Sequence, residues 1–105
     1  MPKNKTNPSK TPPNSPLLSY EFRLQGVVQG VGFRPFVYKI ATKHNLKGFV
    51  CNDTQGVFIL VQGNKKDLKA FAKDLQNPPK AAKITHFSKN PCSAHKLYQD
   101  FTIQQ

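Results

Sequence analysis

The sequence predicts one α+β domain in which two helices cover one face of an antiparallel sheet. Strand-like stretches, in which apolar and polar residues alternate, stand on either side of two stretches with apolar residues at helical spacing. Turns rich in glycine, proline and asparagine separate them. The chain has 105 residues, which is enough for a single domain. The resulting order, β-α-β-β-α-β with a short fifth strand at the end, is the ferredoxin-like sandwich.

The N-terminal segment offers almost nothing that a core could bury. Residues 1–18 are rich in proline, asparagine, serine, threonine and lysine, and they contain no acidic residue. We therefore expect a disordered, basic, proline-rich tail over 1–18 and a folded domain over 19–105.

The first strand and the first helix are expected on either side of a glycine-rich loop. Alternation around Phe22 predicts a strand over about 20–28, and apolar residues at helical spacing predict a helix from about residue 33. Pro35 indicates the helix start, because proline is favoured at the first helical position. The helix should end at His44 or Asn45, since asparagine tolerates the left-handed conformation that follows a helix.

A hairpin and a second helix should follow. Apolar runs at 48–52 and 57–61 are separated by a turn, which predicts a hairpin. Asn64 is a good N-cap for the helix after it, with Asp67 three residues later. A fourth strand is expected over 82–88, with Ile84 and Phe87 on opposite faces if it is regular. A polar loop over 90–96 and a last strand over 100–104 complete the chain.

The net charge and the two cysteines exclude some classes of function, but they do not identify the function. The net charge of +11 favours anionic partners, and nucleic acid, an anionic membrane or a small phosphorylated substrate would all satisfy it. The two cysteines are not spaced as a zinc or disulfide framework, so we expect a buried, reduced Cys51 and a Cys92 in a loop. No apolar run reaches the length of a membrane span, and the N-terminus has no signal-peptide pattern. These features predict a cytoplasmic protein without a membrane partner.

The loop between the first strand and the first helix is the candidate anion site. It contains Gly30 and Gly32, and Arg34 follows at the helix start. Such a loop can turn several backbone N–H groups toward one point, while the helix N-terminus and a guanidinium add positive charge. A phosphate or sulfate ion would suit this place. The pattern is neither a Walker loop nor a dinucleotide fingerprint, and a solvated turn is the alternative.

Two motifs resemble those of the acylphosphatase family. Residues 24–34 read L-Q-G-V-V-Q-G-V-G-F-R and match the first family signature at every fixed position. Residues 48–52 read G-F-V-C-N, followed by Gly56, and match the second. In finer detail the chain is similar to the N-terminal domain of the HypF hydrogenase-maturation carbamoyltransferases. The resemblance covers about residues 20–105.

The resemblance implies a site and a reaction, the hydrolysis of an acyl phosphate without metal or cofactor. Arg34 matches the family arginine that grips the phosphoryl group, and Asn52 matches the asparagine that orients the attacking water. The matched phosphate cradle consists of the backbone amides of Gln29, Gly30, Val31, Gly32 and Phe33. The HypF resemblance implies carbamoyl phosphate as the substrate and further carbamoyltransferase domains beyond this one.

Other readings of the same residues remain open. A non-catalytic module that binds carbamoyl phosphate would use the same loop. A basic RNA-binding module fits the topology, but residues 57–61 lack the aromatic pattern of RNA-recognition sheets, so no specific nucleic-acid partner is expected. His44 is interpreted as structural, because nothing nearby completes an acid–base pair. His86 is expected on the face of Ile84 and is also interpreted as structural.

Overall fold

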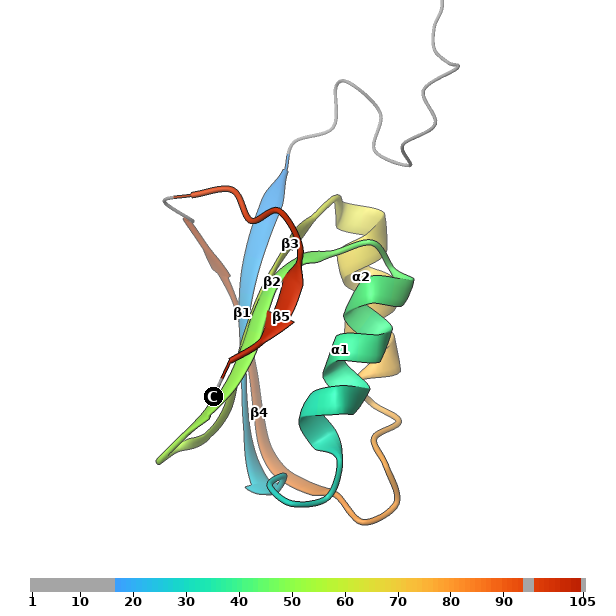
Figure 1. Cartoon of the computed structure of the whole chain (residues 1–105), viewed down its shortest axis with the longest axis vertical. Helices are drawn as coiled ribbons and strands as arrows, with labels where there is room; N and C mark the ends of the chain where they lie inside the picture. Colours follow the sequence, from blue (N-terminus) through green and yellow to red (C-terminus); the bar gives the residue numbers. More distant parts are fainter. Residues whose placement is uncertain (1–16, 94–95, 105) are drawn as a thin grey trace, which may run out of the picture.

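A computed structural model of the chain describes residues 17–93 and 96–104 (Figure 1). The expected tail up to residue 16 lies outside these residues. Leu18, the last residue of the expected tail, is the first residue of a strand and packs against the core.

The described residues form five strands and two helices in the expected order. β1 spans Leu18–Val27, α1 Phe33–Lys43, β2 Lys47–Asp53, β3 Gly56–Gly63, α2 Lys65–Asp74, β4 Lys83–Cys92 and β5 Phe101–Ile103. The strands lie side by side in the order β4-β1-β3-β2-β5. The first three neighbouring pairs are antiparallel, and the short edge strand β5 runs parallel to β2. The ferredoxin-like fold is confirmed, with one parallel pair at its edge.

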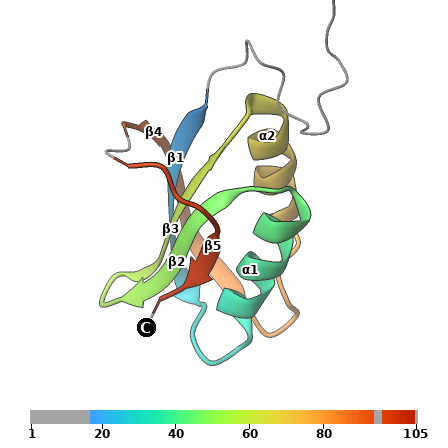
Figure 2. The ribbon, with the colours of Figure 1, turned by 45° about the horizontal axis from the view of Figure 1, so that its top comes forward.

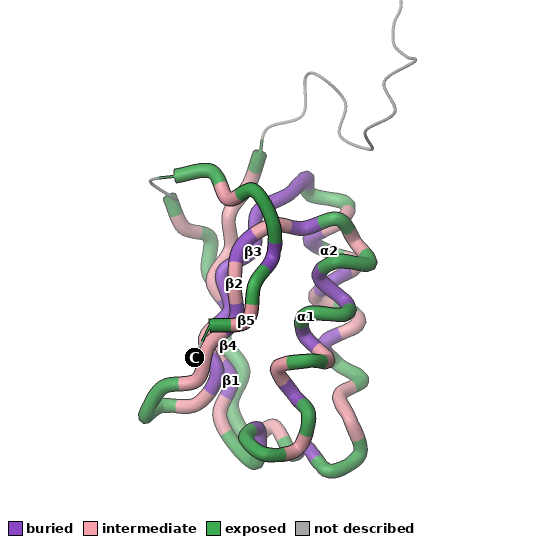
Figure 3. Tube along the Cα trace, viewed as in Figure 1, coloured by how far each residue is buried: buried purple, intermediate pink, exposed green. Residues whose placement is uncertain are grey.

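Both helices lie on the same side of the sheet, and the core fills the space between the two layers (Figures 1 and 2). Figure 3 shows that residues facing this space are buried, whereas the outer sides of the helices are exposed. Phe22 of β1 lies at its centre, with its ring 5.5 Å from that of Phe71 of α2. Phe33 and Val37 of α1 and Val50 of β2 are also buried in this core. The domain therefore has one core, and the other face of the sheet is left for other contacts.

The ends of α1 follow from local backbone chemistry. The helix starts at Phe33, so Pro35 is its third residue and the expectation that it would be the first is wrong. Proline is tolerated there because the first four N–H groups of a helix have no partner within it. At the other end Asn45 has φ 62°, its N–H donates to Thr42 O, and Leu46 N–H donates to Ala41 O. This is a Schellman motif, which confirms the predicted helix end.

β4 differs most from expectation. It continues to Cys92, so part of the expected polar loop is strand, and Cys92 ends a strand instead of lying in a loop. The pairing of β1 with β4 shifts between Gln25 and Gly26, which leaves an extra residue in β4. This bulge interrupts the alternation, so Ile84 and Phe87 share the core face and do not lie on opposite faces.

The face of the sheet away from the helices carries a second, smaller apolar cluster. The Phe49 ring lies 5.9 Å from that of Phe58 and 5.7 Å from that of Tyr98. Gln62, only 2% exposed, donates to Lys96 O and accepts from Tyr98 N–H. The buried amide of Gln62 thus holds the segment before β5 across this face.

Candidate active site

The glycine loop between β1 and α1 lies at one end of the sheet (Figure 1). Gly30 and Gly32 have φ 72° and 77°, the left-handed region that residues with side chains rarely adopt. A Cβ atom at either position would have no neighbour within 4 Å. Glycine is needed here for its backbone conformation and not to avoid a clash, and the space over the loop is free for a ligand.

The start of α1 lacks the side-chain cap that α2 has. The N-cap of α1 is Gly32, which has no side chain to accept a hydrogen bond, and its first turn contains no acidic residue. The N-cap of α2 is Asn64, whose Oδ1 accepts from Asp67 N–H at 2.8 Å. The first amides of α1 are therefore left with the partial positive charge of a helix N-terminus and no side-chain acceptor.

Arg34 adds a full positive charge at this helix start. It is the second residue of α1, and its side chain is half-buried. Within residues 17–93 and 96–104 it forms no ion pair, whereas Arg23 does. A guanidinium held beside free amides and without a carboxylate partner suits an incoming oxyanion.

Asn52, the other candidate catalytic residue, lies near the end of β2. It is the sixth residue of β2 and pairs with Val57, which is fully buried, so its side chain lies on the face covered by the helices. Its Oδ1 atom is buried and has no hydrogen-bond partner in the described part of the chain. Buried polar atoms are nearly always paired, so this oxygen is poised to accept a hydrogen bond from a bound molecule.

A polar cavity joins the loop to the β2–β3 hairpin. Its volume is about 400 Å³. Gln29, the first residue of the expected cradle, lies on one side of it, and Thr54, Gln55 and Gly56 of the hairpin lie on another. None of the described residues that line it has a charged side chain. The cavity is large enough for a small, uncharged polar group beside the cradle.

An ion pair lies next to Asn52 along β2, on the opposite face of the sheet. Arg23 Nη1 lies 2.6 Å from Asp53 Oδ2, and this hydrogen bond, with a second from Gln55 N–H, lowers the pKa of the Asp53 carboxyl. Burial raises the pKa of the Cys51 thiol; Asp53 adds to the rise, and Arg23 and Arg34 oppose it. Cys51 itself is only half-buried, not buried as expected.

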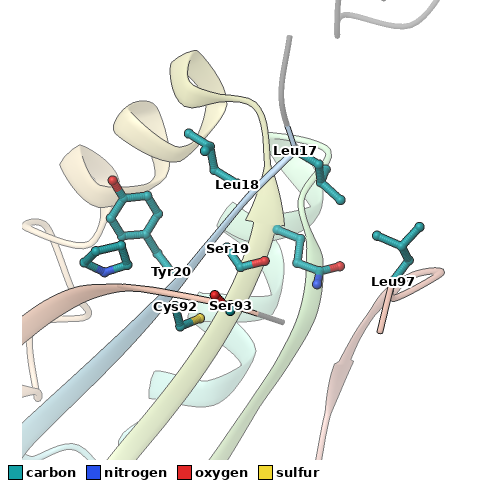
Figure 4. Close-up of a pocket in the computed structure, with 9 residues that line it drawn as sticks. Leu17, Leu18, Ser19, Tyr20, Cys92, Ser93 and Leu97 are labelled. Atoms are coloured by element: carbon teal, nitrogen blue, oxygen red, sulfur yellow. The ribbon is translucent and has the colours of Figure 1, made fainter. Parts of the chain in front are cut away.

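A second cavity, of about 460 Å³, lies between the start of β1 and the end of β4 (Figure 4). Leu17, Tyr20, Cys92 and Leu97 are among its lining residues. It includes neither the glycine loop nor Asn52, so it is not part of the candidate site.

Sequence reasoning missed two charged pairs. Arg23 and Asp53 pair across the sheet, and His44 Nε2 lies 2.7 Å from Asp74 Oδ2. His44 therefore does have an acidic neighbour, contrary to our expectation, although no residue of the candidate site takes part in the pair. His86 is exposed and its ring contacts Thr85 Oγ1. In each pair the partners are 30 residues apart, and no local pattern indicates which distant side chain a strand or a helix will meet.

The described residues contain no group of three or more His, Cys, Asp or Glu side chains that could hold a metal ion. Among their helices, none has the length and apolar character needed to cross a membrane.

The described residues define a small ferredoxin-like α+β domain with a glycine loop and Arg34 at the start of α1. Comparison with known proteins makes this specific, because the acylphosphatase family model matches residues 20–103. The chain belongs to the acylphosphatase family.

Individual relatives divide into two groups. The acylphosphatase of Thermotoga petrophila is 38% identical over 80% of this chain and 93% of its own length. The acylphosphatase structure from Bacillus subtilis superposes with a TM-score of 0.78 at 35% identity, covering 84% of this chain and 99% of that one. The probable carbamoyltransferase HypF of Methanocaldococcus jannaschii is 41% identical over 82% of this chain, which spans only 11% of that protein. Full-length HypF, solved in a phosphate- and nucleotide-bound form, gives a TM-score of 0.83 at 39% identity over 87% of this chain and 12% of that one.

Proposed function

We propose that the acyl phosphate binds at residues 29–34, with its phosphoryl oxygens on the amides of Gln29 to Phe33 and on the Arg34 guanidinium, and that Asn52 orients the attacking water. The observation that carries this proposal is the buried, unpaired Oδ1 of Asn52 on the sheet face that α1 covers. The proposal is also supported by the start of α1, which has no side-chain cap, and by Arg34, which has no ion-pair partner among the described residues.

Hydrolysis of an acyl phosphate depends more on positioning of the substrate and the water than on proton transfer by a side chain. An acyl phosphate has a carboxylate as its leaving group, so the main tasks are to hold the phosphoryl group and to stabilise its developing charge. Asn52 Oδ1 accepts a hydrogen bond from the water and aims its oxygen at phosphorus. A new P–O bond forms to the water, the P–O bond to the acyl group breaks, and the carboxylate departs. The water's proton goes to an oxygen of the substrate's own phosphate, so no side-chain base is required.

Carbamoyl phosphate is the substrate that we propose in particular. The carbamoyltransferase relatives support it, and the cavity beside the loop is polar and uncharged, which suits a small carbamoyl group. Because the chain spans about a tenth of those relatives, a role in hydrogenase maturation would require the domains that they have in addition.

The decisive test is phosphate release from carbamoyl phosphate and from benzoyl phosphate, with no metal added. We expect turnover of both, with a higher kcat/KM for carbamoyl phosphate. Turnover of benzoyl phosphate alone would reject the carbamoyl assignment and keep the hydrolase. Phosphate binding without any turnover would replace the enzyme by a non-catalytic binding module.

A further inference from the structure

The outer face of α2, a helix that the structure describes in full, carries four lysines and no acidic residue. The four are all exposed, and they are Lys65, Lys66, Lys69 and Lys73. At about 3.6 residues per turn, their side chains fall within an arc of about 100° around the helix axis. Asp67 and Asp74, the acidic residues of α2, lie outside this arc. We call the four lysines the α2 lysine stripe, which runs about 12 Å along the helix.

The charge of the stripe is not neutralised within the described part of the chain. The ion pairs found there are Arg23–Asp53 and the contacts of Asp74 with Lys43 and His44. Asp74, although it belongs to α2, is thus engaged by the end of α1, with His44 Nε2 2.7 Å from its Oδ2 atom. The stripe is therefore a run of positive charge without a counter-charge among the described residues.

The lysines do not help α2 to form. Lys69 stands four residues from both Lys65 and Lys73, and like charges at this spacing destabilise a helix. Lys65 and Lys66 also lie in the first turn, where the helix dipole disfavours cations. The side of α2 that packs on the sheet is the opposite one, on which Phe71 is buried. The stripe thus has a cost for the free domain, and a bound polyanion would remove that cost.

The composition of the stripe favours a phosphate backbone over a protein or a membrane. Protein–protein interfaces are depleted in lysine and enriched in aromatic residues. A helix that lies in a membrane surface needs an exposed apolar side. The apolar side of α2 packs in the core, and none of the large exposed apolar side chains among residues 17–93 and 96–104 lies on this helix. Lysine ammonium groups act as point charges, which neutralise phosphates without reading bases.

We propose that the α2 lysine stripe is a sequence-independent binding surface for the phosphate backbone of double-stranded nucleic acid. A duplex carries one negative charge for about every 1.7 Å of its axis, so a stripe of about 12 Å can reach several phosphates. Each lysine that neutralises a phosphate releases condensed counterions, and this release drives binding. No lysine of the stripe belongs to the phosphate site proposed at residues 29–34, so the two functions are independent. A solvated face that binds nothing is the alternative.

The experiment measures binding of the full chain to a fluorescently labelled DNA duplex of mixed sequence, by anisotropy at a series of salt concentrations. The stripe variant combines Lys65→Gln, Lys69→Gln and Lys73→Gln. The matched control removes the same charge from three exposed lysines in other parts of the domain, and it combines Lys39→Gln, Lys83→Gln and Lys96→Gln. Scrambling the duplex sequence should change the affinity little, because no base is read.

We expect the wild type to bind the duplex and the stripe variant to bind about tenfold or more weakly at about 50 mM salt. The slope of the logarithm of the binding constant against the logarithm of salt concentration should fall by about 2.7 in magnitude, since each phosphate contact contributes about 0.9. The control variant should change this slope by less than about one. The stripe variant should melt at the same temperature as the wild type or higher, because like-charge pairs have been removed from α2. Its phosphate release from benzoyl phosphate should equal that of the wild type.

Three results would overturn the proposal. Equal losses of affinity and slope in the two triple variants would show that binding follows net charge and that the stripe is no site. Absence of duplex binding by the wild type at about 50 mM salt would leave the face solvated. Tighter stripe-dependent binding to polyglutamate, or to vesicles containing phosphatidylserine, at equal concentration of anionic groups would assign the face to an acidic protein or to a membrane. Lys69→Gln alone, which should lower the slope by about 0.9, provides the same test if the triple variant does not fold.

Discussion

Replacing Asn52 by alanine should separate stability from activity. The side-chain oxygen is buried without a partner in the described chain, and a buried acceptor left unpaired costs about 1–3 kcal/mol. Removing it takes this cost away but also removes some packing, so we expect Asn52→Ala to be as stable as the wild type or up to about 1 kcal/mol more stable. In a domain of this size, 1 kcal/mol corresponds to roughly 4–8 °C in Tm.

The same change should reduce turnover severely. Loss of one oriented catalytic hydrogen bond typically costs about two to three orders of magnitude in kcat. Phosphate affinity should stay near that of the wild type, because Asn52 is proposed to touch the water and not the phosphoryl group. Urea unfolding, phosphate inhibition constants and kcat for benzoyl phosphate measure the three quantities.

A clear loss of stability in Asn52→Ala would show that the oxygen has a partner in solution and that the side chain is structural. Loss of phosphate binding as complete as in Arg34→Ala would assign Asn52 to the cradle. Asn52→Ser is the matched variant, because its shorter hydroxyl can still accept a hydrogen bond, so partial activity is expected.

The other predictions concern Arg34 in the phosphate cradle, the His44–Asp74 ion pair and the need for metal ions. Arg34→Ala should lose both phosphate affinity and turnover, and Arg34→Lys should recover little of either because it lacks the guanidinium fork; phosphate inhibition and kcat measure this. The hydrogen bond from His44 lowers the pKa of Asp74, so its contribution to stability is present above the unfolded carboxyl pKa of about 3.9 and is lost as pH falls through the lower folded value. Asp74→Asn should therefore destabilise the domain at pH 6–7, and urea midpoints should converge with those of the wild type near pH 2. Phosphate release should survive exhaustive chelation, and activity that a divalent ion restores after chelation would reject the metal-free mechanism.

Local patterns were sufficient for the order of the elements. The alternation around Phe22, the cap at Asn64 and the left-handed residue Asn45 are each determined by neighbours in the chain, and all three lie where the sequence predicts them. The bulge in β4 could not be predicted in this way, because it depends on how β4 aligns with β1 some sixty residues earlier.

In the candidate site, too, features that depend on chain neighbours could be predicted, whereas those that depend on strand alignment could not. The glycine loop and Arg34 are contiguous, so their grouping at a helix start could be predicted from the sequence. Asp53 lies in the predicted turn between residues 52 and 57, where its carboxylate accepts a hydrogen bond from Gln55 N–H. Its ion pair with Arg23 was missed because it depends on how β1, β3 and β2 align in the sheet. No local sequence motif predicts that alignment.

The alternation along β2 has a consequence for folding experiments. Asn52 faces α1, while its neighbour Asp53 faces the opposite side of the sheet. A slip of β2 by one residue against β3 would exchange them and turn a carboxylate toward the cradle. On the proposed mechanism such a slipped hairpin would be inactive even if its secondary structure looked native. The return of phosphate release during refolding would therefore report the correct strand register, which circular dichroism cannot distinguish.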